Sequence, residues 1–503
     1  IISRMPTLPL NVYNQVMSMN DLDGAFKPSR ATYIISPELT YAPGTQALKG
    51  KISGWELLCS VLAFAAPVTS VSSLIPFVIQ GGGIGAPLLI LAATILMLSF
   101  SIGFVAMSGH VAKPGAFYAY VAEACGIKIG NGTAFVAVFA YFTLGFCTVA
   151  LIGPVFSSFL SEVFGIRGVP WYVGSMLSFM ITGFLSYLRI DLSAKILTLT
   201  MFAEIAVVLI FNLIVPFSNN GQNFSVEPLS PSHFLDGNFT VAFLYSIIIF
   251  IGFESTAVYR DEVKNPKKTI PLVTYAAVLF IGCFYAFSAW MIIMAYGVDN
   301  VMEAANKDTA NLFMNAMATY MGKTSVDITR GILIISAIAC LLSAHNALAR
   351  YIYSLSRNGA ISHKFGKIHP KHMSPYVASL SCTLGWALAT LAFIKSDPSL
   401  LYAQVGGVGT YAMLILMSLT SIAVLYFFLR RKEFSFRTTV CPLLAVAGIL
   451  SFTLLTTVNF HYLTGGEPGS GIWLQLIIVG MFAFGYFSAL FRPRSASLAA
   501  TES

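Results

Sequence analysis

Long apolar segments recur along the chain and restrict it to one environment. Windows of about 19–20 apolar residues, the length that crosses a bilayer as a helix, recur from residue 54 to residue 491. Of the 503 residues, 56% are hydrophobic and 10% are charged, whereas soluble domains carry about 25% charged residues. A soluble core cannot bury this much apolar surface. The sequence therefore indicates an all-α integral membrane protein.

We place twelve transmembrane helices in these windows. Residues 1–48 are mostly polar and are predicted to form a tail before the first span, without the pattern of a cleavable signal. Residues 492–503 are predicted to form a second tail after the last span. The predicted spans are 54–79, 86–108, 131–160, 170–188, 194–216, 239–260, 270–296, 326–355, 374–394, 400–429, 438–458 and 471–491.

The basic residues predict the orientation of the chain. Twelve spans put both termini on one side, and that side carries 24 of the 29 Lys and Arg residues. Because basic loops stay in the cytoplasm, both termini are predicted to be cytoplasmic. This bias also accounts for the net charge of +8, so no nucleic-acid partner is expected. The opposite side holds Arg167, Lys307, Lys323, Arg330 and Lys395.

Two predicted spans carry helix-breaking residues near their middle. Pro67 lies in the first span, where it removes a backbone hydrogen bond and clashes with the preceding turn. Gly252 and Glu254 lie at a comparable depth in the sixth span. Interrupted helices in matching positions indicate an inverted-repeat transporter whose substrate site lies at the two breaks. The alternative is a pair of ordinary kinks.

Motifs of enzymes and metal sites are missing from the sequence. The seven cysteines stand singly in apolar runs, which is typical of buried thiols rather than metal ligands. There is no glycine loop followed by Lys-Ser/Thr and no His-Glu-x-x-His. We therefore expect no enzyme, no metal and no bound cofactor, and a transporter driven by ion or solute gradients.

Four segments resemble one family, the amino acid–polyamine–organocation (APC) permeases, over residues 49–491. The stretch GFES…DEVKNPKKTIP, which ends at Pro271, is similar to the family's sixth helix and following loop. The second segment, KPGAFYAYVAEACG (Lys113–Gly126), is similar to the family's Pro–Gly–Tyr-x-Tyr segment after helix 2. The third, NALARYIYSLSRNGAIS (Asn346–Ser362), is similar to the end of helix 8. The fourth, GGVGTYA (Gly406–Ala412), is similar to a Gly-Thr motif in helix 10.

The resemblance implies a LeuT-type fold and alternating access. Residues 49–430 would form a five-plus-five inverted-repeat core with broken helices 1 and 6. Residues 431–491 would add helices 11 and 12. The resemblance also implies an amino acid or amine as cargo, carried with or against a proton or another solute.

The resemblance places the substrate at the two breaks. In helix 1 the family often has a Gly-Ser-Gly-like run that holds a carboxylate. Here Thr69, Ser70 and Val71 stand in its place, next to Ala66, which puts that pose in doubt. In helix 6 the carbonyls of Phe250, Ile251 and Gly252 would accept from an amino group. Phe253 would close as a gate or pack in the core, and Glu254 would contact substrate or brace the break.

The sequence also departs from the family at Glu204. Several family members carry a lysine at this position, where it substitutes for a bound sodium ion. It lies nine residues beyond Lys195, about 13–14 Å along a helix and near the membrane centre. Carboxylates at this depth usually face a cavity, a partner or a proton path. Three roles stay open: a proton-coupling site, a countercharge for a cation or the substrate ammonium, and a structural hydrogen-bonding group.

Other polar residues are candidates for the site or for a gate. Tyr141 and Thr143 in helix 3, and Ser343 and His345 in helix 8, either line the cavity or are satisfied structurally. A charged cluster on the cytoplasmic side would form an ion-pair gate, the alternative being a solvated loop. Its members are Arg260, Asp261, Glu262, Lys264, Arg350 and Arg357.

These observations predict a secondary transporter in the plasma membrane. We expect this membrane to be a bacterial inner membrane. Its partners would be the lipid bilayer and a small amino acid or an amino-acid-derived amine, with a proton as the coupling ion and sodium left open. The alternatives are an amine or polyamine permease without carboxylate recognition, and a permease-like sensor or channel. A monomer and a homodimer both fit the sequence.

Overall fold

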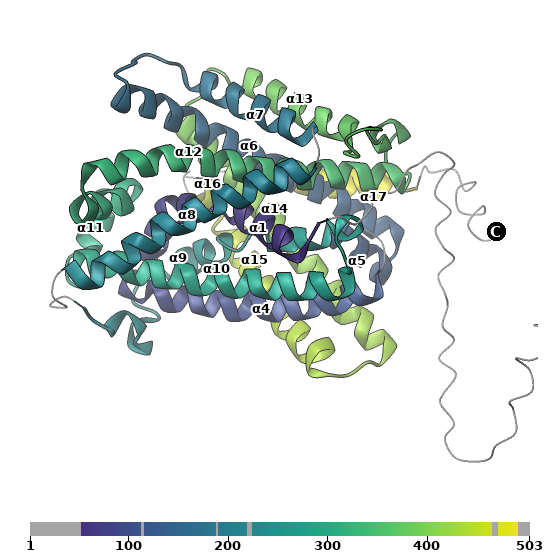
Figure 1. The fold of residues 1–503 in the computed structure, drawn as a ribbon. Coiled ribbons are helices and arrows are strands. Elements are labelled where there is room, and N and C mark those ends of the chain that lie inside the picture. Colours follow the sequence, from purple (N-terminus) through teal and green to yellow (C-terminus); the bar gives the residue numbers. More distant parts are fainter. Residues whose placement is uncertain (1–51, 112–114, 188–189, 219–223, 465–470, 491–503) are drawn as a thin grey trace, which may run out of the picture. The chain divides into compact units, whose positions relative to one another are not determined.

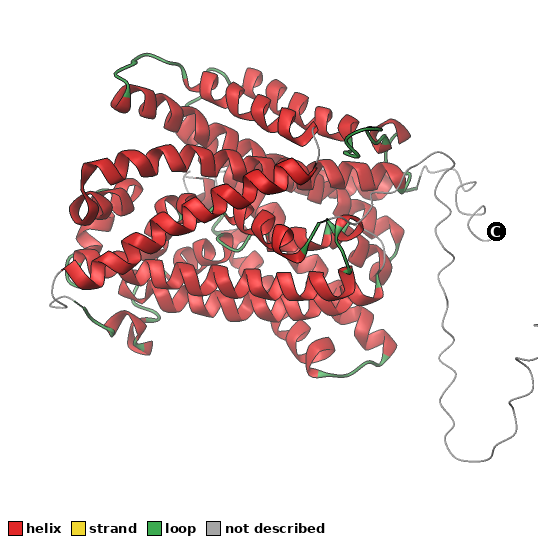
Figure 2. Cartoon of the chain, viewed as in Figure 1, coloured by secondary structure: helices red, strands yellow, loops and turns green. Residues whose placement is uncertain are grey.

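The computed structural model of the chain describes residues 52–111, 115–187, 190–218, 224–464 and 471–490, with side chains except for 190–196. These ranges form helices joined by short loops, and Ile52 pairs with Val263 in an isolated bridge (Figure 2). The predicted tails, residues 1–48 and 492–503, and the side chain of Lys195 lie outside the described residues.

The helices follow the order of the predicted spans (Figure 1). The first nine α-helices are α1 (Gly54–Ala65), α2 (Pro67–Ser73), α3 (Ile75–Gly82), α4 (Ala86–His110), α5 (Ala116–Cys125), α6 (Ile127–Val163), α7 (Trp171–Tyr187), α8 (Ile190–Ser218) and α9 (Phe239–Ile248). The others are α10 (Pro266–Tyr296), α11 (Val301–Lys307), α12 (Leu312–Arg357), α13 (Tyr376–Ala392), α14 (Pro398–Arg431), α15 (Cys441–Val458), α16 (His461–Thr464) and α17 (Ile472–Ser488).

Short helices of one or two turns connect these elements. They are η1 (Gly83–Gly85), η2 (Glu227–Leu229), η3 (Pro231–His233), η4 (Phe253–Ala257), η5 (Arg260–Glu262), η6 (Thr309–Asn311), η7 (His363–Gly366) and the π-helical η8 (Phe436–Val440). Inside α12, Gly322 takes a φ of 79° and turns the chain, so the predicted span 326–355 begins just after it.

The all-helical membrane class is confirmed. Among the described residues, nine helical stretches are long and apolar enough to cross a membrane. The apolar helices α13 and α17 are shorter, with 17 residues each, and α7 occupies the fourth predicted span. The number of twelve spans stays a prediction.

Packing between the long helices separates a buried interior from a lipid-facing surface. α6 packs against α12 and α14, and α4 lies along α10 (Figure 1). α8 contacts α1, α2 and α12. Leucines at helical spacing stay exposed on α13, as expected for a helix face that meets lipid. They are Leu380, Leu384, Leu388 and Leu391.

Candidate functional site

The first predicted span is interrupted at Ala66. α1 ends at Ala65, Ala66 takes a left-handed conformation with a φ of 44°, and Pro67 starts α2. Proline fits the first position of a helix because its missing N–H would have no partner there. Thr69, Ser70 and Val71 were expected to form the unwound run, but they lie inside α2. The break therefore precedes them by three residues.

Side chains from other helices satisfy the carbonyls freed at this break. The Ala65 carbonyl accepts from Ser70 Oγ at 2.7 Å and from the Tyr285 hydroxyl at 2.9 Å. The Phe64 carbonyl accepts from Cys340 Sγ at 3.3 Å. In a membrane interior unpaired carbonyls are costly, so these bonds stabilise the interruption.

The second break lies where the sequence predicts it. α9 ends at Ile248, and the chain then turns through Gly252, whose φ is 117°, into η4. The Phe250 carbonyl accepts from the Phe253 N–H at 3.4 Å, and the Gly252 carbonyl accepts from Ser255 N–H and Oγ. Two of the three carbonyls that were expected to meet an amino group thus make local bonds. Contact of Phe250, Ile251 and Gly252 with substrate stays a prediction.

Glu254 braces this break. Its carboxylate accepts from the Tyr141 hydroxyl at 2.7 Å and from the Gly252 N–H at 2.8 Å, and its side chain is 1% exposed. The two bonds tie α6 to η4 and to the turn before it. They match the bracing role that the sequence left open, while substrate contact by Glu254 or Tyr141 stays a prediction.

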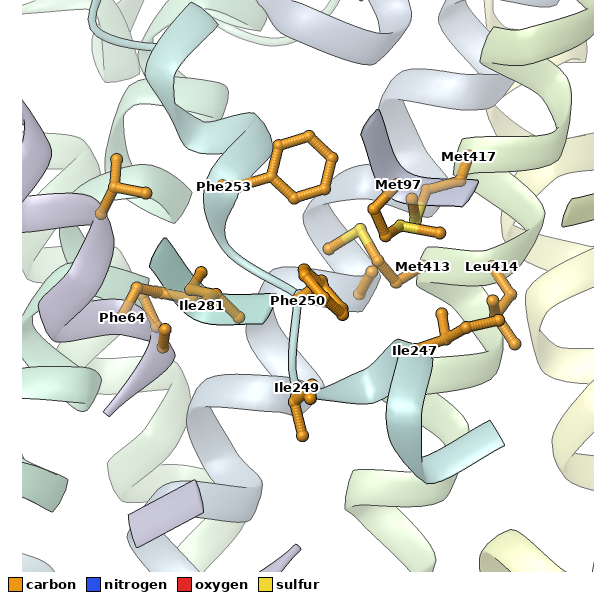
Figure 3. Close-up of a cluster of buried hydrophobic side chains, with 14 of the residues drawn as sticks. Phe64, Met97, Ile247, Ile249, Phe250, Phe253, Ile281, Met413, Leu414 and Met417 are labelled. Carbon is orange, nitrogen blue, oxygen red and sulfur yellow. The ribbon is translucent and has the colours of Figure 1, made fainter. Parts of the chain in front are cut away.

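Phe250 and Phe253 lie in an apolar cluster beside the break (Figure 3). Phe253 is buried and stands edge-on to Phe100, with ring centroids 5.9 Å apart. Figure 3 shows both phenylalanines on the side of the chain that faces Met97 and Met413. In this conformation Phe253 packs as a core residue, and its role as a gate stays a prediction.

Glu204 of α8 reaches the start of α2. Its Oε2 accepts from the Val68 N–H at 3.4 Å, and its Oε1 has no hydrogen-bond partner among the described residues. The side chain is 0% exposed. Nearby, Thr69 Oγ1 and Ser336 Oγ lie 3.1 Å apart. An incompletely bonded carboxyl group thus lies beside the first break, inside the membrane-spanning region.

Glu262 and Arg350 form a buried ion pair between η5 and α12. The guanidinium donates through Nε and Nη2 to the two carboxylate oxygens, the second bond being 3.0 Å long. Arg350 also donates to the Asn346 carbonyl at 2.9 Å and lies 4.6 Å from the centre of the Tyr259 ring. The bridge between Ile52 and Val263 joins the start of α1 to the same region.

Two other members of the predicted gate, Arg260 and Asp261, lie beside Glu262 in η5. Arg260 donates to the Ser108 carbonyl at 2.7 Å. Burial raises the pKa of the Asp261 carboxyl group, and the charge of Arg357 opposes that shift. The sequence cluster is therefore not simply a solvated loop, because Glu262 and Arg350 are buried and paired. Its action as a gate stays a prediction.

The remaining polar candidates make structural bonds. Ser343 Oγ donates to the Ser60 carbonyl at 2.7 Å and so ties α12 to α1. Thr143 Oγ1 donates to the Phe139 carbonyl of its own helix at 2.8 Å. His345 lies 3.0 Å from Ser186 Oγ and 3.0 Å from Thr383 Oγ1. Lining of the substrate cavity by Ser343 stays a prediction.

Sequence reasoning missed three residues at the breaks: Phe64, Tyr285 and Cys340. Phe64 covers Gly252 so closely that a Cβ atom there would lie 2.0 Å from its Cδ1. Tyr285 and Cys340 donate to the break carbonyls. In the sequence all three stand in apolar runs and cannot be told from core residues.

Comparison with known proteins decides the family. The model of the amino acid permease family matches residues 53–494. The chain belongs to the amino acid permease family. This permease is therefore a transporter rather than an enzyme, as the sequence predicts.

Curated relatives of the permease include transporters and exchangers. The branched-chain amino acid permease BcaP of Bacillus subtilis is 24% identical over 56% of this chain and 57% of its own length. The serine/threonine exchanger SteT of Bacillus subtilis is 22% identical over 72% of this chain and 81% of its own length. Amino acid transporter protein 6 of Caenorhabditis elegans is 24% identical over 80% of this chain and 75% of its own length.

The brace at the second break can be tested with Tyr141→Phe. The substitution removes the hydroxyl donor and leaves the Glu254 carboxylate with the Gly252 N–H. We expect the free energy of unfolding to fall by about 1–3 kcal/mol, the cost of a buried polar group that loses its partner. Thermal unfolding in detergent measures this loss of stability. Tyr426→Phe, at an exposed position of α14, is the matched control and should change little. Equal unfolding curves for the two variants would argue against the brace.

Proposed function

We propose that the permease is a secondary active transporter that carries a small amino acid across the plasma membrane by alternating access, coupled to protons through Glu204. The observation that carries this proposal is the buried Glu204 carboxyl group, which contacts α2 beside the helix break with one oxygen unbonded. A carboxyl group in this setting changes its hydrogen bonds when it gains or loses a proton. Such a change would act directly on the half-helix next to the substrate site.

The break carbonyls favour a proton over sodium as the coupling ion. Sodium is a hard cation that needs several oxygen ligands. The carbonyls of Phe64 and Ala65 already accept bonds from Cys340, Ser70 and Tyr285. A proton needs only the free Glu204 oxygen.

Alternating access would use the two broken helices and the buried ion pair. The interruptions fall in the first and sixth predicted spans, five helices apart, as in a five-plus-five inverted repeat. Glu262 and Arg350 would keep the cytoplasmic side closed until the pair separates, with both termini on that side. Neutral amino acids are the first substrates to test, because the names of two relatives specify branched-chain amino acids and serine or threonine.

Glu204→Gln tests the coupling. Wild-type protein in proteoliposomes should take up labelled leucine, serine or threonine at a rate that depends on pH. For one proton per substrate, a gradient of one pH unit supplies about 1.4 kcal/mol, or about a tenfold accumulation ratio. The Gln variant should lose this accumulation, because a carboxamide does not take up or release a proton across this pH gradient.

The exposed Glu303→Gln in α11 is the control and should keep the pH dependence. Normal, pH-driven accumulation by Glu204→Gln would refute the coupling role. Trans-stimulated exchange of labelled substrate is measured in the same vesicles, because a channel or a mute sensor would not show it.

A further inference from the structure

The ends of α7 and α13 meet in an aromatic cluster on the predicted cytoplasmic side. Tyr187, the last residue of α7, lies edge-on to Tyr376, the first residue of α13, with ring centroids 6.4 Å apart. The ring of His369, in the loop before α13, has its centroid 5.2 Å from that of Tyr187 and 5.8 Å from that of Tyr376. Tyrosine side chains are enriched where lipid headgroups meet the membrane interior. We therefore expect the cluster at the depth of the headgroups.

Hydrogen bonds fix the loop that holds His369. The Ser374 carbonyl accepts from the His369 N–H at 2.9 Å, and Ser374 Oγ donates to the Tyr187 carbonyl at 2.9 Å. His369 Nδ1 accepts from the N–H groups of Lys371 and His372, at 3.2 Å each. Because a nitrogen that accepts carries no proton, we assign the ring proton to Nε2. Nε2 has no hydrogen-bond partner among the described residues, so the fixed ring keeps a free donor.

The same loop carries positive charge without a countercharge. Lys364, Lys367 and Lys371 are exposed, and none of them forms an ion pair within the part of the chain that the structure describes. In the sequence no acidic residue lies between Asp327 and Asp397. We name residues 363–374 the basic loop. Its charge favours an anionic partner.

Apolar helix surface begins directly next to the basic loop. α7 packs against α13 (Figure 1). The exposed leucines of α13 start at Leu380, one turn beyond Tyr376. On α7, Phe184 is exposed one turn before Tyr187. A ligand bound at the loop thus meets a charged surface with its polar part and an apolar surface with the adjoining part, which is the division of a phospholipid.

We propose that the basic loop, together with Tyr187 and Tyr376, binds the phosphate headgroup of an anionic phospholipid, whose acyl chains lie along the exposed faces of α7 and α13. His369 Nε2–H donates to a phosphate oxygen, and such a bond to an ionised acceptor is stronger than one between neutral groups. Lys367 and Lys371, which flank His369 in the sequence, supply the positive charge. A soluble phosphate compound or an acidic peptide would leave the exposed leucines without contact, so the surface favours a lipid.

Lipid titration of the full chain in neutral detergent, followed by native mass spectrometry, tests the site. Phosphatidylglycerol is the probe, and phosphatidylcholine, whose headgroup has no net charge, should bind much more weakly. Each basic residue near an anionic headgroup contributes about fivefold to affinity, so Lys367→Gln/Lys371→Gln should weaken phosphatidylglycerol binding about 30-fold. His369→Asn keeps an acceptor in place of Nδ1 and removes the Nε2–H. This variant should weaken binding about tenfold, as expected for a lost hydrogen bond to a charged group.

The matched control is Lys267→Gln/Lys268→Gln, which removes the same charge from exposed positions at the start of α10, on the same predicted side. It should bind phosphatidylglycerol nearly as the wild type does. Equal weakening in the two double variants would reveal a general attraction to basic surface and overturn the site. Equal binding of phosphatidylcholine would overturn the anionic headgroup. Displacement of the lipid by glycerol phosphate at the same concentration would replace the lipid by a soluble phosphate ligand.

Folding is measured apart from binding. The four substituted lysines are exposed, so both double variants should unfold thermally as the wild type does when no lipid is added. Added phosphatidylglycerol should then raise the unfolding temperature of the wild type and the control variant, because a ligand stabilises the state that binds it. The same rise in Lys367→Gln/Lys371→Gln would contradict the proposal.

Discussion

Replacing Arg350 by alanine is expected to lower the free energy of unfolding by about 3–5 kcal/mol and to abolish transport. The pair that Arg350 forms with Glu262 is buried, with side chains 7% and 7% exposed. Removing the guanidinium leaves the Glu262 carboxylate in the interior without its countercharge, and the Tyr259 ring loses a cation. An uncompensated buried charge is costly because the protein interior solvates it poorly.

Thermal unfolding in detergent and exchange in proteoliposomes measure the two effects. Arg330→Ala is the matched control, since Arg330 pairs with Glu162 at side-chain exposures of 31% and 47%. An exposed pair contributes about 0–1 kcal/mol, so this variant should unfold nearly as the wild type does. A double variant with methionine at positions 262 and 350 should regain stability without regaining exchange, because an apolar pair packs well but cannot separate into water. Equal stability of Arg350→Ala and Arg330→Ala would contradict the prediction.

Gly252→Ala is expected to disrupt the second break. Gly252 has a φ of 117°, a region that side-chain-bearing residues rarely adopt, and the strain of a new side chain costs about 1–3 kcal/mol. The added Cβ would also lie 2.0 Å from Cδ1 of Phe64. Phe64 has little room to move, because its ring packs edge-on against Tyr141 with centroids 6.2 Å apart. Overpacking of this kind costs a further 1–3 kcal/mol or so.

Uptake and thermal unfolding should both fall in this variant. Gly331→Ala in α12 is the control, because its nearest neighbour would be Phe159 at 3.7 Å, an ordinary contact. Alanine is a better helix former than glycine by about 1 kcal/mol, so the control should be neutral or more stable. A second change, Phe64→Leu, should restore part of the lost stability in Gly252→Ala by removing the clash while the backbone strain remains. Unchanged uptake by Gly252→Ala would show that the turn tolerates a side chain.

Local sequence patterns predicted most of the elements and part of the site. Apolar length placed the spans, and Pro67 and Gly252 placed the two breaks, because proline and glycine act on the backbone of their own turn. The unwound run in helix 1 was misplaced by three residues. The prediction assigned the family's unwound run to Thr69, Ser70 and Val71, whereas the chain unwinds at Ala66 and the helix restarts at Pro67.

Contacts between distant residues could not be predicted in this way. Val68 and Glu204 are 136 residues apart, and Ala65 and Tyr285 are 220 apart. The apolar run around Tyr285 does not indicate whether its hydroxyl donates a hydrogen bond to a broken helix or to a carbonyl of its own helix. The same holds for Cys340, whose exposure depends on the helices packed around it.

The sequence by itself determined the membrane environment, the helical class, the two interruptions and the charged cluster that contains the buried ion pair. These follow from properties that each segment carries alone: apolar length, backbone geometry and charge. Only the tertiary structure decided which groups satisfy the break carbonyls, that Glu204 lies against α2, and that Glu262 and Arg350 form a buried pair. Those facts depend on helix packing, which joins side chains that the chain order keeps apart.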